Sequence, residues 1–139
     1  MSDPHPVVLL VEDEPLVRMF NADVLDDANY RVIEAVNGEE ALTLFEARPD
    51  IRIVVTDVEM PGSLNGFELA RRVTEMRSFV GVLIVSGRVR PADEELPDDA
   101  LFLAKPYTAA ELLCAVQNVI KIHKSKRPTP DEEGHSRSR

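Results

Sequence analysis

Five short apolar runs recur along the chain, separated by stretches with helical spacing. The runs cover residues 7–11, 31–35, 51–56, 81–85 and 100–104. Runs of this length, rich in Val, Ile and Leu, are typical of strands that are buried on both faces of a parallel sheet. We therefore expect five strands, with a helix or a loop after each.

Four of the intervening segments have apolar residues three or four positions apart, as one face of a helix requires. They cover residues 16–28, 39–48, 67–76 and 108–123. In the first helix Leu16, Phe20, Val24 and Ala28 recur every four positions. The segment 88–99 contains two prolines, so we expect only a short or irregular fourth helix there. Strands that alternate with helices predict an α/β fold with a doubly wound five-stranded parallel sheet.

Ionisable and hydroxyl side chains follow four of the predicted strands. Glu12 and Asp13 follow the first strand, Asp57 the third, Ser86 the fourth and Lys105 the fifth. The carboxyl ends of parallel strands meet at one edge of a sheet, where ligands bind in open α/β folds. Carboxylates without nearby His or Cys favour Mg²⁺ as the ligand. The sequence therefore predicts a site for Mg²⁺ and a phosphoryl group.

Charge and composition exclude several classes of function. Residues 1–120 carry a net charge of −12, which argues against direct binding of nucleic acid. No apolar run is long enough to span a bilayer, and the N-terminus shows no signal-peptide pattern. Cys114 is the only cysteine and cannot form an internal disulfide, so we expect a cytoplasmic protein. We predict one domain at 1–123 and a disordered basic tail at 124–139.

The motifs, in their order and spacing, resemble the receiver domain of bacterial two-component response regulators. They are Glu12-Asp13, Asp57 within TDVEMPG, Ser86-Gly87, and Lys105 within KPY. The resemblance covers about residues 6–123. It implies a flavodoxin-like sheet with strand order 2-1-3-4-5.

The resemblance also implies roles for the residues at the sheet edge. Asp57 would accept a phosphoryl group from a histidine kinase or a histidine phosphotransfer protein. Mg²⁺ would be held by Asp13, Asp57 and the backbone carbonyl of Glu59, with Glu12 acting through water. Lys105 would pair with the phosphoryl oxygens.

Signalling in the family implies a switch pair and an unusual peptide bond. Ser86 would move toward the phosphoryl group, and Phe102 would turn inward as the Ser86 loop moves. The peptide bond between Lys105 and Pro106 would be cis.

Three features depart from the commonest family pattern. The loop at 60–66 is one residue longer, and we expect its tip to be mobile. Phe102 lacks the hydroxyl of a tyrosine, so no signal can depend on a hydrogen bond from it. The segment 88–99 is short and acidic, and we hypothesise that the partner or dimer mode differs from that of DNA-binding regulators.

We predict a stand-alone receiver, a monomer or weak dimer that acts through a downstream protein and catalyses only its own phosphorylation and dephosphorylation. Only 16 residues follow His123, too few for an output domain. Three alternatives stay open. The chain is a receiver piece of a hybrid kinase, a chemically silent receiver, or a Mg²⁺-dependent aspartyl-phosphate phosphohydrolase with Glu59 as general acid/base. Turnover of a phosphate ester distinguishes the phosphohydrolase from a receiver.

Overall fold

The structure is a computed structural model that describes residues 5–87, 97 and 99–124. Its described part contains a five-stranded parallel sheet with the order β2-β1-β3-β4-β5, which confirms the predicted fold class. The strands are β1 (Val7–Val11), β2 (Arg31–Ala35), β3 (Ile51–Asp57), β4 (Gly81–Ser86) and β5 (Leu101–Ala104). Strands β3 and β4 each run one residue further than expected and so include Asp57 and Ser86.

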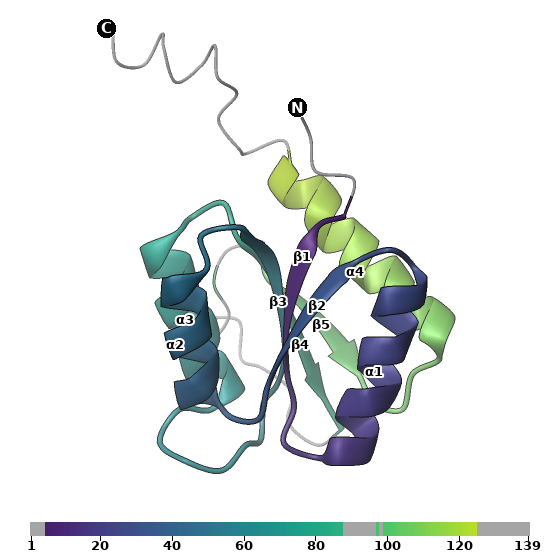
Figure 1. The fold of residues 1–139 in the computed structure, drawn as a ribbon, viewed down its shortest axis with the longest axis horizontal. Helices are drawn as coiled ribbons and strands as arrows, with labels where there is room; N and C mark the ends of the chain where they lie inside the picture. Colours follow the sequence, from purple (N-terminus) through teal and green to yellow (C-terminus); the bar gives the residue numbers. More distant parts are fainter. Residues whose placement is uncertain (1–4, 88–96, 98, 125–139) are drawn as a thin grey trace, which may run out of the picture.

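Helices cover both faces of the sheet, as Figure 1 shows. Helices α2 and α3 pack on one face, and α1 and α4 pack on the other. They are α1 (Pro15–Asp27), α2 (Gly38–Ala47), α3 (Gly66–Met76) and α4 (Ala109–Lys124). None of the helices in the described residues is long and apolar enough to cross a membrane. The irregular fourth helix expected within 88–99, and the tail beyond Lys124, lie outside the described residues.

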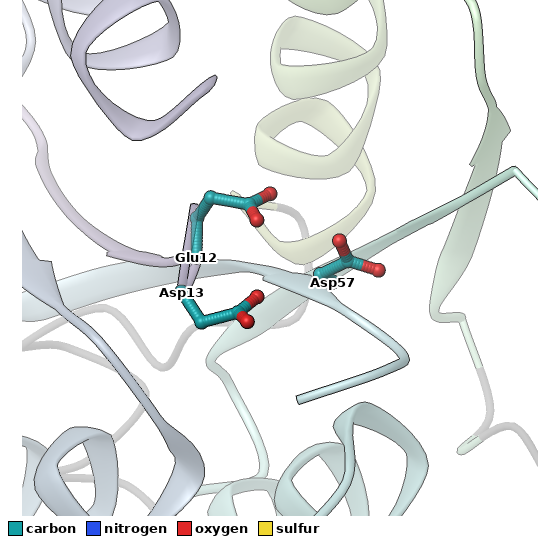
Figure 2. Close-up of side chains that lie close together, drawn as sticks. All are labelled: Glu12, Asp13 and Asp57. Atoms are coloured by element: carbon teal, nitrogen blue, oxygen red, sulfur yellow. The ribbon is translucent and has the colours of Figure 1, made fainter. Parts of the chain in front are cut away.

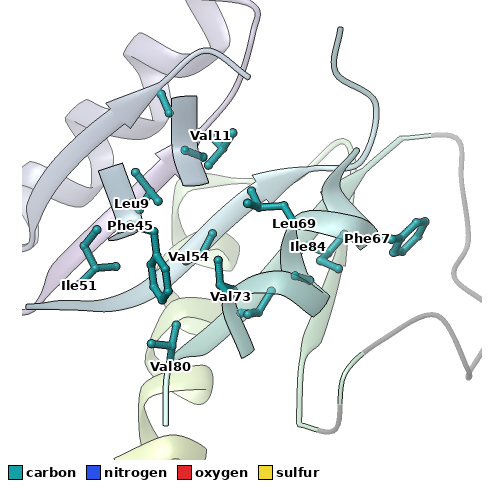
Figure 3. Packing of buried hydrophobic residues seen from close by; sticks show 14 of the residues in the cluster. Leu9, Val11, Phe45, Ile51, Val54, Phe67, Leu69, Val73, Val80 and Ile84 are labelled. Carbon is teal, nitrogen blue, oxygen red and sulfur yellow. The ribbon is translucent and has the colours of Figure 1, made fainter. Parts of the chain in front are cut away.

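The core has two halves, one on each side of the sheet, because successive strand residues point to opposite faces. Figure 3 shows the half under α2 and α3, where Phe45 packs among Leu9 and Val54. On the other side Leu10 and its neighbours pack against α1 and α4. Burying a side chain of this size contributes about 1.5–3 kcal/mol. The two half-cores hold β1 and β3 in the centre, and these strands carry the acids.

Side-chain caps fix where three of the helices begin, including a capping box at Asn65 before α3. Asn37, the N-cap of α2, accepts a hydrogen bond from the Glu40 amide at 2.8 Å. Thr108 and Glu111 form a capping box before α4, with bonds of 2.8 and 3.1 Å. Such a cap contributes about 1 kcal/mol and satisfies amides that the helix leaves without partners.

The apolar stripe predicted for α1 does not face the core along its whole length. Leu16 is 78% exposed and Phe20 is 50% exposed, whereas Asn21 and Leu25 are buried. A spacing of four residues exceeds the helical repeat of 3.6, so such a stripe winds around the helix. Only its C-terminal half meets the sheet. Met76 on α3, also predicted in an apolar stripe, is 43% exposed.

Candidate functional site

Three carboxylates meet where β1 and β3 end. Val11 pairs with Thr56 across the two strands, so Glu12 and Asp57 follow at neighbouring positions. One oxygen each from Glu12, Asp13 and Asp57 lies within 4.8 Å of the others. Figure 2 shows the three side chains facing a common space. Oxygen ligands of this kind suit Mg²⁺, so the residues fit the cation that the sequence predicts.

Lys105 brings the opposite charge to this cluster from the end of β5. Its Nζ lies 2.8 Å from Asp57 Oδ2 and 3.7 Å from Glu12 Oε1. Burial alone would lower the pKa of Lys105, but the hydrogen bond to Asp57 and the charges of both acids raise it. The ammonium is therefore charged at neutral pH. The peptide bond between Lys105 and Pro106 is cis, as the resemblance implies.

Glu12 is the most deeply buried of these acids, with 3% of its surface exposed. Burial is the main cause that raises its pKa from 4.5 to about 7, and the charge of Asp57 adds to the effect. A hydrogen bond from the Glu14 amide, at 3.2 Å, and the charge of Lys105 act in the opposite direction. Glu12 is therefore only partly ionised at neutral pH, and its protonation reduces the repulsion between the neighbouring carboxylates.

The cluster lines an open pocket of about 360 Å³, which we call the acidic pocket. Its walls are formed by Glu12, Asp13, Glu14, Asp57, Glu59, Gly87 and Lys105. The Glu59 amide donates to Asp57 Oδ1 at 3.3 Å, which orients the carboxylate from the loop side. Asp57 keeps 8% of its surface exposed, so it is reachable from this pocket.

The two predicted switch residues lie near the acidic pocket but outside its described lining. Ser86 is 2% exposed and follows Val85, which pairs with Asp57 across β3 and β4. Its carbonyl accepts a hydrogen bond from the Lys105 amide at 2.9 Å. Phe102 is half-buried against the core half beneath α2 and α3. Both residues therefore lie behind the site, on the strands next to it.

A second hollow, which the sequence did not predict, adjoins the acidic pocket. This α1 groove, of about 550 Å³, is lined by Glu14, Leu16, Val17, Phe20, Asn21, Lys105, Pro106 and Tyr107. Asn21 Nδ2 donates to the Tyr107 hydroxyl at 2.8 Å, while the buried Asn21 Oδ1 has no partner among the described residues. The signal in the sequence was the four-residue spacing, which turns Leu16 and Phe20 away from the core.

Comparison with known proteins assigns the family. The model of the response regulator receiver domain matches residues 8–117. The chain belongs to this family. Its membership confirms the resemblance drawn from the motifs, and it favours a receiver over an aspartyl-phosphate phosphohydrolase.

Relatives of two kinds match the chain. It is 31% identical to the response regulator receiver protein CpdR of Brucella abortus over 116 residues, which cover 81% of this chain and 95% of CpdR. It is 37% identical to the sensor kinase CckA of the same organism, but the match covers 82% of this chain and only 12% of that kinase. The receiver is thus similar both to a small regulator and to one part of a large kinase.

Solved structures agree with the fold. A response regulator receiver protein from Sinorhizobium medicae superposes with a TM-score of 0.79 and 26% identity, covering 88% of this chain and 99% of that one. The chemotaxis protein CheY4 of Vibrio cholerae gives a TM-score of 0.74 and 28% identity, covering 83% and 98% of the two chains. These receivers have the architecture described above.

Proposed function

We propose that Asp57 accepts a phosphoryl group from a phosphorylated histidine of a sensor kinase or phosphotransfer protein. The observation that carries the proposal is the hydrogen bond of 2.8 Å between Lys105 and Asp57, beside two further carboxylates. A carboxylate oxygen of Asp57 bonds to phosphorus as the bond from phosphorus to the imidazole nitrogen breaks. The electron pair of that bond leaves with the imidazole ring.

Charge compensation is the main contribution that the pocket makes to this transfer. Lys105 offsets part of the charge of Asp57 and of the incoming group. Asp13, Asp57 and the Glu59 carbonyl would hold Mg²⁺, with Glu12 acting through water. The cation, when bound, supplies positive charge that neutralises the phosphoryl oxygens.

Ser86 and Phe102 would convert this change into a signal. Phosphorylation adds charge and acceptor oxygens at the end of β3, next to the strand that carries Ser86. The Ser86 hydroxyl would donate to the new oxygens. Phe102 pairs in register with Ile84, two residues before Ser86, so a shift of β4 would change its packing. Because Phe102 has no hydroxyl, the signal would pass through packing.

The α1 groove is the surface that we assign to the phosphoryl donor. It shares Glu14 and Lys105 with the acidic pocket, so a protein bound there has its histidine close to Asp57. Leu16, Met19 and Phe20 expose 50% or more of their surface on this side of α1. Exposed apolar side chains that gather beside a reactive site favour a protein contact.

The match to CpdR, which spans 95% of that protein, supports a stand-alone regulator that acts through a downstream protein. The match to CckA supports the alternative, a receiver within a hybrid kinase. The net charge of −9 supports partners other than nucleic acid. The cytoplasmic location, the monomer or weak dimer, and catalysis limited to its own phosphorylation stay predictions.

Intact-mass spectrometry after incubation with a small acyl-phosphate donor tests the proposal. We expect one phosphoryl adduct that requires Mg²⁺ and is lost in Asp57→Asn. Asp23→Asn, an exposed aspartate on α1, is the matched control and should accept the group as the wild type does. A folded wild type that gives no adduct with the small donor or with a phosphorylated histidine phosphotransfer domain would overturn the proposal, and so would an adduct that persists in Asp57→Asn.

A further inference from the structure

Glu39, in the first turn of α2, holds the tip of the loop between β3 and α3. Its Oε2 accepts a hydrogen bond from the Ser63 amide at 2.8 Å and another from the Ser63 hydroxyl at 2.5 Å. These bonds hold the pKa of Glu39 below its ordinary value, so it is ionised at neutral pH. The loop tip predicted to be mobile is therefore fastened to a helix 24 residues away in sequence.

Close backbone packing surrounds these bonds. A Cβ on Gly38 would lie 2.7 Å from the Leu64 Cβ, so α2 meets the loop without room for a side chain. Gly62 has a φ of +99°, and a Cβ there would lie 2.7 Å from Glu39 Oε1. Glu39, Ser63 and these two glycines form one contact, which we call the loop clasp.

Helix capping does not account for the loop clasp. The Asn37 side chain already caps α2, and the neighbouring Glu40 accepts from the Val36 amide at 2.8 Å. Glu40 thus closes the start of its own helix, whereas Glu39 reaches a different segment. The two adjacent glutamates have separate tasks, and only that of Glu39 concerns the loop.

The clasped loop is the one that lines the acidic pocket. It begins at Asp57 and includes Glu59, whose backbone carbonyl is a proposed cation ligand. The Gly66 amide donates to the Val58 carbonyl at 2.9 Å and closes the base of the loop. The Glu59 amide and the Met60 side chain also contact β3, so the bonds of Glu39 add a restraint at the tip of the loop to those at its start.

We propose that Glu39 is a positioning residue that, through Ser63, holds this loop so that the Glu59 carbonyl faces the cation in the acidic pocket. The inference rests on the proposed function for the place of the cation. Residues that orient a ligand from behind typically change metal affinity by about 10–100-fold when they are removed. Glu39 acts through a loop, so the low end of that range applies.

The test compares Glu39→Ala and Ser63→Ala with Glu40→Ala, a matched control on the same helix turn. Hydrogen exchange at the Ser63 amide is measured without Mg²⁺, and the Kd for Mg²⁺ is measured from the amide shifts of Asp13 and Glu59. In Glu39→Ala we expect exchange about tenfold faster and a Kd about tenfold weaker. Glu40→Ala should leave both near the wild-type values, and Ser63→Thr, which keeps both donors, should do the same.

Two results would overturn the inference. One is faster exchange at Ser63 with an unchanged Kd in Glu39→Ala, because the clasp would then not reach the pocket. The other is an equal loss of affinity in Glu40→Ala, because any disturbance of α2 would then suffice. A wild type that binds Mg²⁺ but takes no phosphoryl group would overturn only the proposed function, since the Kd values still compare the variants.

Discussion

The acidic pocket and the α1 groove lie side by side and share Glu14 and Lys105. They differ in that the pocket buries charged side chains, which are usually exposed, and the groove exposes apolar side chains, which are usually buried. The pocket buries charge, since Glu12 and Asp57 are 3% and 8% exposed. The groove exposes apolar surface, with Leu16 78% exposed. A folded protein rarely does either without a function.

This difference agrees with the proposal that the acidic pocket carries out phosphoryl transfer and that the α1 groove binds the protein that donates the phosphoryl group. The acids of the pocket come from the ends of β1 and β3, the central strands, whose side chains pack on both faces of the sheet. The groove comes from the first half of α1, which packs little against the sheet. Changes in the pocket should therefore affect every phosphoryl donor, whereas changes in the groove should affect only donors that are proteins.

The largest effect is expected for Glu12→Gln in the pocket. Since the pKa of Glu12 is raised from 4.5 to about 7, the folded state binds its proton more tightly than the unfolded state does. Its contribution to the free energy of unfolding therefore falls as pH rises from 4.5 to about 7, by about 3 kcal/mol. Glu12→Gln should remove this fall. Urea unfolding of both proteins between pH 5 and 8, without Mg²⁺, measures the difference.

Glu14→Gln serves as the control for that series, because Glu14 is exposed and its neutralisation should leave the profile unchanged. If the free energy of unfolding changes with pH in the same way in the wild type and in Glu12→Gln, burial of ionised Glu12 does not destabilise the fold. The contrast between a pocket that buries charge and an ordinary surface would then fail.

A smaller effect is expected for Phe20→Ser in the groove. Loss of one apolar contact at a protein interface costs about 1–2 kcal/mol, or roughly tenfold in the transfer rate from a phosphorylated histidine phosphotransfer domain. Phosphorylation by a small acyl-phosphate donor should not change. Met76→Ser on α3, also an exposed apolar residue, should change neither rate. Equal losses with both donors would mean that the groove belongs to the chemistry.

The smallest effect concerns Asn21 and Tyr107, which line the groove next to Lys105. Asn21→Leu combined with Tyr107→Phe removes a buried amide oxygen that has no partner within the described residues, and should raise the free energy of unfolding by about 1 kcal/mol. Tyr107→Phe alone should lower it by a similar amount, because both ends of the amide then lack partners. Urea unfolding of the wild type, the two single variants and the double variant gives a double-mutant cycle. A double variant that is less stable than the wild type would contradict the prediction.

Local pattern predicted the strands and the residues at their ends, because a strand that is buried on both faces is a continuous apolar run and the first polar residue marks its end. Asp57 and Ser86 fell one residue outside their predicted strands, since a polar residue can still pair with a neighbouring strand. The stripe of α1 was misplaced because a four-residue spacing does not say which half of the helix meets the sheet. The strand ends therefore gave the location of the acidic pocket. The four-residue spacing of α1 was interpreted as a core-facing stripe and not as the signal of a groove.

Contacts between distant segments could not be predicted in the same way. The hydrogen bonds of Glu39 depend on how α2 packs beside a loop that begins after the next strand. The sequence around Glu39 and Ser63 contains no pattern that distinguishes them from ordinary solvent-exposed residues. The bond between Asn21 and Tyr107 likewise joins residues 86 positions apart.

The hydrogen bond between Gly66 and Val58 bears on how this family changes over evolutionary time. A side chain at Gly66 would place its Cβ 2.3 Å from the Asp57 carbonyl, so α3 starts against the backbone of the proposed phosphoacceptor. Insertions and deletions between Val58 and Gly66 would change the length of the loop at 59–65 without moving the end of β3 or the start of α3. The one-residue extension predicted for this loop would leave both of these points in place, whereas any replacement of Gly66 would displace α3.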